Sequence, residues 1–263
     1  MWPGNVGGRC AVGHQFVAAA KESAPGVGAG CRRMIELQVL RAFEVRRDGD
    51  VVSLPPSAQR LVAFLAVHER PVHRDLVSGS LWLESTERQA DTSLRATLRQ
   101  LGREGRPLID AKGRLVRLEP DVAVDLHDAR HRARAVLERV GTSAGDIDRL
   151  CLAGELLPGW YDDWVLVERE RFRHLRLHAL DALCEALTLA GRYAAAVVVG
   201  RAAVDSEPLR ESARRLLIQA HLAGGDRDEA IYQYRDFRGL LASELGLTPS
   251  AQLTALVAPI PIR

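Results

Sequence analysis

Arginines recur at helical spacing along one stretch of the chain, and the planar guanidinium suits phosphate and guanine better than other side chains do. The residues in this series are Arg88, Thr92, Arg95, Arg99, Arg103 and Arg106. At 100° per residue they fall within an arc about 80° wide. The residues on the opposite side are Ala90, Leu94, Thr97, Leu98 and Leu101. The series therefore predicts a helix with one buried face and one cationic face, whose arginines neutralise phosphates or pair with guanine O6 and N7.

The alternative for such a series is a solvated helix surface, which is what most runs of charge are. Interleaved acids would favour that alternative, but Glu87, Asp91 and Glu104 lie outside the arc. A short hairpin is expected after the helix, and its turn carries Lys112 and Arg114. A helix followed by a basic hairpin favours contact with double-stranded DNA.

Composition limits the class of protein. The chain has 263 residues, of which 47% are hydrophobic and 27% charged, as in an ordinary globular protein long enough for two domains. No apolar run approaches the roughly 20 residues of a membrane helix, and the four cysteines show no CxxC spacing. We expect a cytoplasmic, nucleoid-associated protein with no membrane contact, no metal and no other cofactor.

Net charge says little about partners, because it is only +2 for the whole chain. Residues 32–127 carry 16 basic and 14 acidic side chains, and residues 128–263 carry 18 and 19, so these halves have charges of +2 and −1. Lysine is nearly absent, with Lys21 and Lys112 alone. Binding to nucleic acid must therefore come from local patterning rather than from a basic protein body.

The first half of the chain begins with short strands. Residues 1–33 show no sustained period, so we expect a disordered tail or an upstream extension before a true start at Met34. Strand-like stretches follow at residues 35–40, 43–46 and 51–54, with an Asp-Gly turn between the last two. These stretches predict a small N-terminal sheet.

Three helices and a hairpin follow this sheet. Ser57 is expected to cap the first helix, residues 74–82 form the second, and Ser85 or Thr86 opens the third. The hairpin spans residues 108–118, and an extended piece covers 121–126. This order predicts a winged helix-turn-helix DNA-binding domain over residues 34–126.

Beyond residue 127 the pattern is helical throughout. The expected helices cover residues 127–140, 145–153, 167–190, 193–206, 209–223 and 227–245. Glycine-containing breaks at 190–192 and 223–226 lie 33 residues apart, which resembles the period of tetratricopeptide repeats. The fold class predicted for the chain is an α+β winged helix-turn-helix followed by an all-α, tetratricopeptide-like helical repeat over residues 127–263.

Other residues of the chain have types and spacings that could bind a ligand or a metal ion. Trp160, Tyr161 and Trp164 could stack on bases or a ligand, but aromatic residues more often bury large areas, and we expect them to wedge the two halves together. His174 and His178 have the i, i+4 spacing of a metal pair, yet they lack the glutamate of HExxH, so a packing or surface role is favoured.

The sequence gives little support for a catalytic function. Asp162 and Asp163 could act as general acid and base, but they fit a polar loop beside the aromatic residues. No GxxxxGK[ST] loop exists for nucleotide hydrolysis, since neither lysine lies in such a motif. We expect no enzyme activity.

Two regions of the chain resemble the domains of a known family. Residues 35–126 resemble the response-regulator-type winged helix of the Streptomyces antibiotic regulatory protein (SARP) family, and residues 127–256 resemble its bacterial transcriptional activator domain. The stretches that carry the resemblance are Leu40–Val45, Ser93–Leu101, Val124–Leu126, Gly154–Trp164, Pro208–Ser212 and Tyr234–Ser250. The resemblance implies an activator that binds direct repeats as side-by-side protomers, a homodimer on DNA, and that contacts RNA polymerase holoenzyme. Its targets would be secondary-metabolite genes.

The resemblance also assigns DNA reading to Arg95, Arg99 and Arg103. Two positions depart from the family, which often has an aromatic residue at Arg99 and a basic residue at Gly102. Glycine costs about 1 kcal/mol of helix stability relative to alanine, so Gly102 predicts an early end of the helix, before Arg103 and Arg106.

The leading hypothesis is a sequence-specific DNA-binding transcriptional regulator. The residues expected to contact DNA are Arg88, Thr92, Arg95, Arg99, Arg103, Lys112 and Arg114. The alternative is a tetratricopeptide-like interaction scaffold that does not bind DNA.

Overall fold

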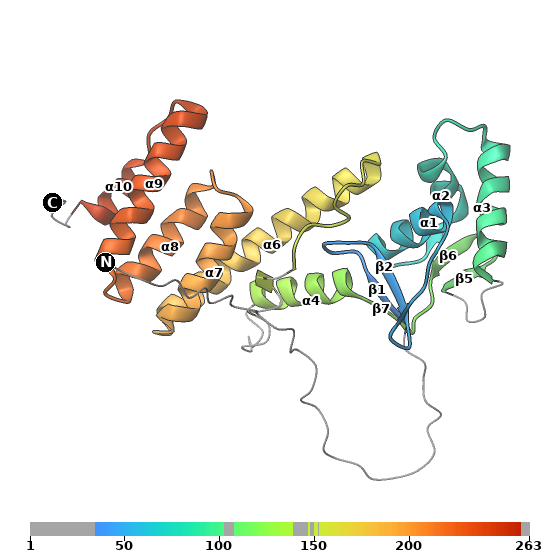
Figure 1. Ribbon diagram of the computed structural model, residues 1–263, viewed down its shortest axis with the longest axis horizontal. Helices are drawn as coiled ribbons and strands as arrows, with labels where there is room; N and C mark the ends of the chain where they lie inside the picture. Colours follow the sequence, from blue (N-terminus) through green and yellow to red (C-terminus); the bar gives the residue numbers. More distant parts are fainter. Residues whose placement is uncertain (1–34, 103–107, 139–146, 148–149, 152, 259–263) are drawn as a thin grey trace, which may run out of the picture. The chain divides into compact units, whose positions relative to one another are not determined.

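The computed structural model describes residues 35–102, 108–138, 147, 150–151 and 153–258 (Figure 1). The predictions for residues 1–33, for Arg103 and Arg106, and for most of the helix at 145–153 lie outside these ranges.

Four strands form the first sheet. They are β1 (Ile35–Gln38), β2 (Glu44–Arg47), β3 (Asp50–Val51) and β7 (Val122–Val124), in the order β3-β2-β1-β7. β1 runs antiparallel to β2 and parallel to β7. The Asp-Gly turn lies between β2 and β3 as predicted, and both of its residues have positive φ (54° at Asp48, 95° at Gly49). β1 alternates as a half-buried strand should, with Ile35 and Leu37 buried and Glu36 exposed.

Two helices follow, α1 (Pro56–Val67) and α2 (Arg74–Leu81). The expectation that Ser57 caps α1 is wrong, because the helix begins two residues earlier than that cap implies, with Pro55 at the cap position and no side-chain cap. Proline suits the first helical turn, since its missing N–H would have no intrahelical partner there. Every residue of α1 from Leu61 to Val67 is buried, so this helix forms the centre of the N-terminal core.

The third helix, α3 (Glu87–Gly102), is followed by a hairpin of β5 (Ile109–Lys112) and β6 (Leu115–Leu118). β6 also pairs with β4 (Val72–His73), which precedes α2 directly, in a sheet of order β4-β6-β5. This sheet places the hairpin beside the helices. The small β-containing part that was predicted, with its three helices and terminal hairpin, is therefore present.

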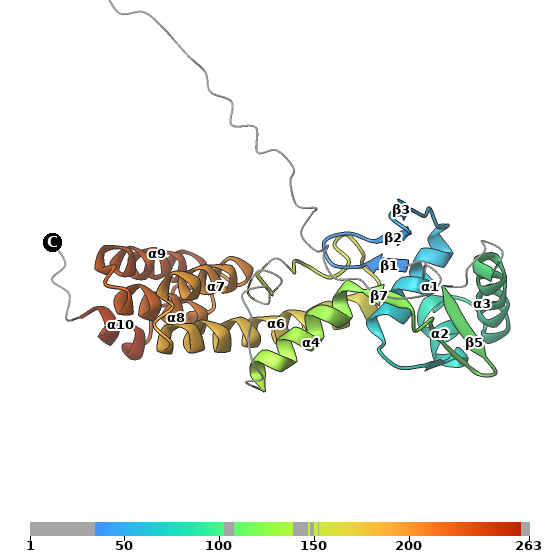
Figure 2. The ribbon, with the colours of Figure 1, turned by 90° about the horizontal axis from the view of Figure 1, so that it is seen from below.

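The rest of the chain is helical, as predicted. Its described helices are α4 (Asp125–Leu137), α6 (Asp163–Leu189), α7 (Tyr193–Ser206), α8 (Glu211–Ala223), α9 (Arg227–Leu245) and α10 (Ala251–Val257). Figures 1 and 2 show that α7, α8 and α9 pack each against the next. At Gly200 of α7, a Cβ would lie 3.3 Å from Cα of Leu217 in α8, so the two helices approach closely there. None of the helices in the described ranges is long and apolar enough to cross a membrane.

The N-terminal core does not end with the winged helix. Leu156, Leu157, Val165 and Phe172 are buried in the same cluster as β1 and α1. The backbone joins the two regions as well, because Leu157 N donates to Val39 O (2.8 Å). The segment before α6 is thus joined to the chain just beyond β1, where Leu40 and Leu156 form an isolated antiparallel bridge.

The aromatic residues of this segment take different places. Trp160 packs on Phe43 with ring centroids 5.6 Å apart, and Trp164 meets Phe64 edge-on at 5.2 Å. Tyr161, in contrast, is 80% exposed. Trp160 and Trp164 therefore join the helical part to the winged helix, as expected, while Tyr161 does not.

A cysteine in the helical core yields a chemical prediction. Cys184 of α6 is 1% exposed, and burial, with a smaller effect from the charge of Asp181, raises the pKa of its thiol to about 12. We expect Cys184 to resist iodoacetamide at pH 8 in the folded protein and to react fully in denaturant, because the thiolate is the reactive form. Mass spectrometry of the peptide that contains Cys184 measures this; rapid native alkylation would contradict the buried position.

Candidate nucleic-acid interface

Helix α3 is held in place by one buried face. Its buried residues are Ala90, Leu94, Thr97 and Leu101. At its start, the side chain of Gln89 accepts hydrogen bonds from the backbone N and the hydroxyl of Thr86, 3.1 and 2.9 Å away. These contacts satisfy a donor that the helix start would otherwise leave unpaired. The predicted division of α3 into an apolar face and a cationic face is present.

The cationic face of α3 is fully accessible. Arg88, Thr92, Arg95 and Arg99 are all exposed. The hydroxyl of Thr92 donates to the carbonyl of Arg88 (2.8 Å), which turns it toward its own helix. Within the described part of the chain, Arg88 and Arg99 make no ion pair with another side chain, so their guanidiniums remain available to an external anion.

Arg95 differs from its neighbours, because it forms an ion pair with Asp91 one turn earlier. The sequence placed Asp91 outside the arginine arc, yet its i, i+4 spacing lets the two side chains meet. Both are partly solvated, so the pair is weak and an incoming phosphate can compete for the guanidinium.

The β5–β6 hairpin carries the other predicted residues. Gly113 turns the hairpin with φ +59°, and Lys112 and Arg114 flank it, both exposed. Asp110 accepts hydrogen bonds from Arg117 Nη2 (3.0 Å) and Lys112 Nζ (3.3 Å). The bond from Arg117, helped by Lys112, lowers the pKa of the Asp110 carboxyl. Lys112 is thus tethered to an ionised carboxylate, whereas Arg114 has no such partner in the described residues.

A hollow of about 690 Å³ lies between α2, α3 and the hairpin. Four arginines from these three elements line it, namely Arg74, Arg88, Arg95 and Arg114. The structure therefore brings Arg88, Arg95 and Arg114 of the predicted set together. Thr92, Arg99 and Lys112 do not line this hollow, and Arg103 lies outside the described residues.

Arg74 belongs to this group, and sequence reasoning missed it. Its backbone N donates to the carbonyl of Arg114 (2.9 Å), because β4 pairs with β6 just before α2 begins. Its Nε is buried without a hydrogen-bond partner among the described residues. A buried donor without a partner is costly, so an anion in the hollow would stabilise it. In the sequence, Arg74 is a single arginine at the start of an expected helix, and no spacing of residues around it indicates an anion contact.

The Asp91–Arg95 pair leads to a prediction about affinity. Replacing Asp91 by Asn removes a negative charge from the arginine face and frees Arg95. We expect DNA binding to tighten by up to about fivefold, because one exposed ion pair contributes about 0.2–1 kcal/mol. Fluorescence anisotropy with labelled DNA measures it, and Asp228→Asn on exposed α9 is the matched control. Unchanged or weaker binding of the Asp91 variant alone would show that α3 does not face DNA.

Of the two histidines considered for metal binding, His174 has a carboxylate partner. His174 Nε2 lies 2.7 Å from a carboxylate oxygen of Glu170 on the same helix. Among the residues that the structure describes, no group of three or more His, Cys, Asp or Glu side chains is arranged to hold a metal ion.

Comparisons of the sequence with known proteins point in one direction. Residues 151–260 match the family model described as the bacterial transcriptional activator domain. The regulatory protein AfsR of Streptomyces coelicolor is 32% identical over 232 residues, which cover 83% of this chain and 23% of that protein. AfsR of Streptomyces griseus is 28% identical over 238 residues, or 84% of this chain and 24% of that protein. The chain therefore spans about a quarter of the length of these curated relatives.

A solved structure shares the fold. Mycobacterium tuberculosis EmbR, in complex with a low-affinity phosphopeptide, superposes with a TM-score of 0.63 and 24% sequence identity. The match covers 86% of this chain and 64% of the EmbR chain. The likeness includes both the small β-containing part and the helices that follow it.

Proposed function

We propose that the chain is a transcriptional regulator of the SARP type that binds double-stranded DNA directly, because residues 151–260 match the bacterial transcriptional activator domain and most of the chain is similar to AfsR. In this proposal α3 lies in the major groove and the β5–β6 hairpin contacts the adjacent backbone. The residues assigned to DNA contact are Arg88, Thr92, Arg95, Arg99, Arg103, Lys112 and Arg114, with Arg74 added.

One observation carries the proposal more than any other. Arg74, Arg88, Arg95 and Arg114 come from three separate elements and line one hollow. These four cations outnumber the acids of the same hollow by one, and this excess supports contact with a phosphate of a DNA backbone. Asp75, Glu87 and Asp91 line the same hollow, and Asp91 is already paired with Arg95.

The experiment is a salt titration of binding. The full chain is mixed with a labelled duplex from the region upstream of its own gene, and the affinity is measured between about 50 and 200 mM salt. Log affinity should fall linearly with log salt, with a slope of about −0.9 for each phosphate neutralised. A duplex of scrambled sequence separates specific from non-specific binding. Absence of salt-sensitive binding to either duplex would overturn the proposal.

We also propose the finer properties that regulators of this type suggest. The protein would bind direct repeats as two side-by-side protomers, act in the cytoplasm at the nucleoid, and activate secondary-metabolite genes through RNA polymerase holoenzyme. Genome-wide mapping of bound sites tests the repeat spacing and the target genes together. In vitro transcription with purified holoenzyme tests activation, and binding without any change in transcript level would contradict it.

A second candidate is an interaction scaffold of helical repeats that does not bind DNA. The Asp91–Arg95 ion pair favours this second candidate, because such pairs also occur on solvated helix surfaces. The salt titration separates the two candidates, since a scaffold with a solvated α3 would show no steep dependence on salt.

A further inference from the structure

A second basic hollow lies away from α3, where the winged helix meets α4 and α6. Its volume is about 810 Å³, within the range of ordinary ligand pockets, roughly 300–1,000 Å³. It is lined by the turn after α1, the start of α2, and residues of α4 and α6. The cations in its wall are Arg70, Arg130, Arg134 and Arg171, and the acids are Glu69 and Glu168.

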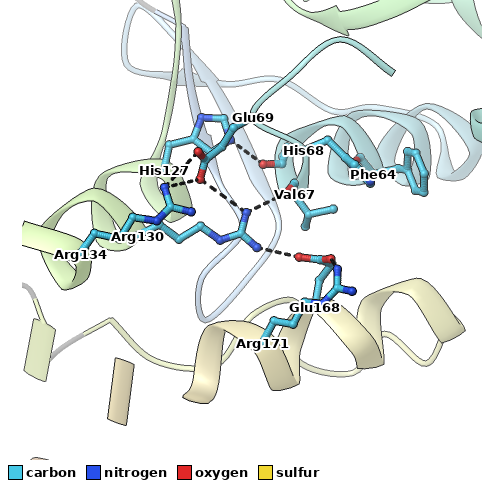
Figure 3. A network of polar contacts seen from close by, with 10 residues as sticks. Phe64, Val67, His68, Glu69, His127, Arg130, Arg134, Glu168 and Arg171 are labelled. Carbon is cyan, nitrogen blue, oxygen red and sulfur yellow. Dashed lines mark hydrogen bonds and ion pairs between the residues drawn. The ribbon is translucent and has the colours of Figure 1, made fainter. Parts of the chain in front are cut away.

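Arg130 is the buried arginine of this group, and it lies between the other charged residues of the hollow (Figure 3). Arg130 is 7% exposed, and it donates from Nη1 to the carbonyl of Val67 (2.7 Å) and from Nη2 to Glu168 (2.8 Å). The second oxygen of Glu168 accepts from Arg171 (2.5 Å), and Glu69 accepts from Arg134 (3.2 Å). The two carboxylates therefore hold three guanidiniums around one hollow.

The hollow remains positive after this pairing. Burial alone would raise the pKa of Glu69, but the hydrogen bond from Arg134 and the charges of Arg134, Arg130 and His127 outweigh it and lower that pKa. Arg70 is exposed in the wall and makes no ion pair within the described part of the chain. Four guanidiniums thus face two carboxylates, and the excess of positive charge is free to bind another anion.

Apart from His68 and His73, the rest of the wall is apolar. Val72 is buried, Leu76 is 55% exposed, and Leu175 of α6 packs at the side. An exposed leucine next to a basic rim fits a ligand that has both an anionic group and an organic body. Inorganic ions alone would gain nothing from these side chains.

We propose that this hollow binds a small phosphorylated organic molecule. Its phosphates would bind Arg70, Arg134 and Arg171, and its body would contact Leu76 and Leu175. Because the wall comes from the winged helix on one side and from α4 and α6 on the other, the ligand ties the two parts together and stabilises the junction.

Isothermal titration calorimetry of the full chain tests the proposal, with sodium pyrophosphate and ADP as probes. Saturable binding of ADP with a Kd of about 1 mM or tighter is expected, and ADP should bind more tightly than pyrophosphate. The double variant Arg70→Gln, Arg171→Gln should weaken ADP binding at least about tenfold, because two charge-assisted hydrogen bonds are lost. Arg171 is 70% exposed and Glu168 keeps Arg130, so this variant is expected to fold, and its melting temperature without ligand checks that.

Two control variants locate the binding. Arg235→Gln with Arg238→Gln removes two exposed charges from α9, and Arg95→Gln with Arg99→Gln removes two from α3. Both should bind ADP as the wild type does. The proposal is overturned if ADP does not saturate at about 10 mM, if it binds no better than pyrophosphate, or if the α3 variant loses binding while the Arg70, Arg171 variant keeps it. That last result would place the anion on α3 instead.

Discussion

Replacing Arg95 and Arg99 together by alanine is expected to weaken binding to the upstream duplex by at least about 30-fold. An arginine that pairs with a base contributes about 1–3 kcal/mol, and each 1.4 kcal/mol is a factor of ten in Kd. Both side chains are exposed on α3, and within the described residues Arg95 forms an ion pair only with the partly exposed Asp91. The loss should therefore reflect DNA contact and not unfolding. Fluorescence anisotropy at fixed salt measures the affinity, and circular dichroism verifies the fold.

The matched control removes two exposed arginines elsewhere. Arg235 and Arg238 lie on α9, and changing both to alanine alters the net charge by the same amount. That control should bind DNA with an affinity within about a factor of two of the wild type. Equal weakening in both double variants would mean that binding depends on net charge alone, which would contradict an α3 interface.

The single variant Arg99→Ala separates two kinds of contact. If Arg99 pairs with a guanine, the variant should lose preference at one base position, since the bidentate contact discriminates by about 1–3 kcal/mol. If Arg99 contacts a phosphate, affinity should fall uniformly across sequences and the salt slope should become shallower by about 0.9. Binding measured on duplexes with single base-pair changes distinguishes the two.

Replacing Arg130 by alanine is expected to lower the free energy of unfolding by about 3–5 kcal/mol. The side chain of Arg130 is 9% exposed and that of its partner Glu168 is 14% exposed, so the variant leaves a nearly buried carboxylate without its buried cation, paired only with the exposed Arg171. The carbonyl of Val67 at the end of α1 also loses its donor. Urea denaturation followed by circular dichroism measures the change.

Two further variants control for this interpretation. Arg134→Ala removes a neighbour on the same helix that is 52% exposed and pairs with Glu69, so its loss should cost about 1 kcal/mol or less. The double variant Arg130→Met, Glu168→Leu should recover much of the lost stability, because it removes both charges at once. A loss at Arg130 no larger than at Arg134 would show that the buried pair does not stabilise the junction.

The elements that sequence analysis predicted best are those with local signals. The predicted ranges 193–206 and 227–245 coincide with α7 and α9, because Gly191 and the Gly224-Gly225 pair mark the breaks before them. The faces of α3 followed from the 3.6-residue period alone. The short helix α10 was not predicted, although Ser250 caps it through a hydrogen bond from Leu253 N.

The contacts that join distant segments could not be predicted in this way. The backbone N atoms of Val39 and Leu40 donate to the carboxylate of Asp125, 86 and 85 residues away, and this carboxylate lies at the start of α4. The extended piece expected up to residue 126 ends at Val124, because α4 begins at Asp125. Nothing local marks Asp125 as such a partner, and the same holds for Arg74 beside Arg114. The i, i+4 spacing of Asp91 and Arg95, in contrast, was visible in the sequence and could have indicated their pairing.

The core that includes both β1 and the first part of α6 limits how proteins of this architecture can exchange parts by recombination. A crossover after residue 126 would separate Leu156, Leu157 and Phe172 from the strand and helix that bury them. Each half would then present apolar surface that its new partner was not shaped to cover. A chimera that takes the winged helix from a relative must therefore take α4, the loop with Trp160 and the start of α6 from that same relative.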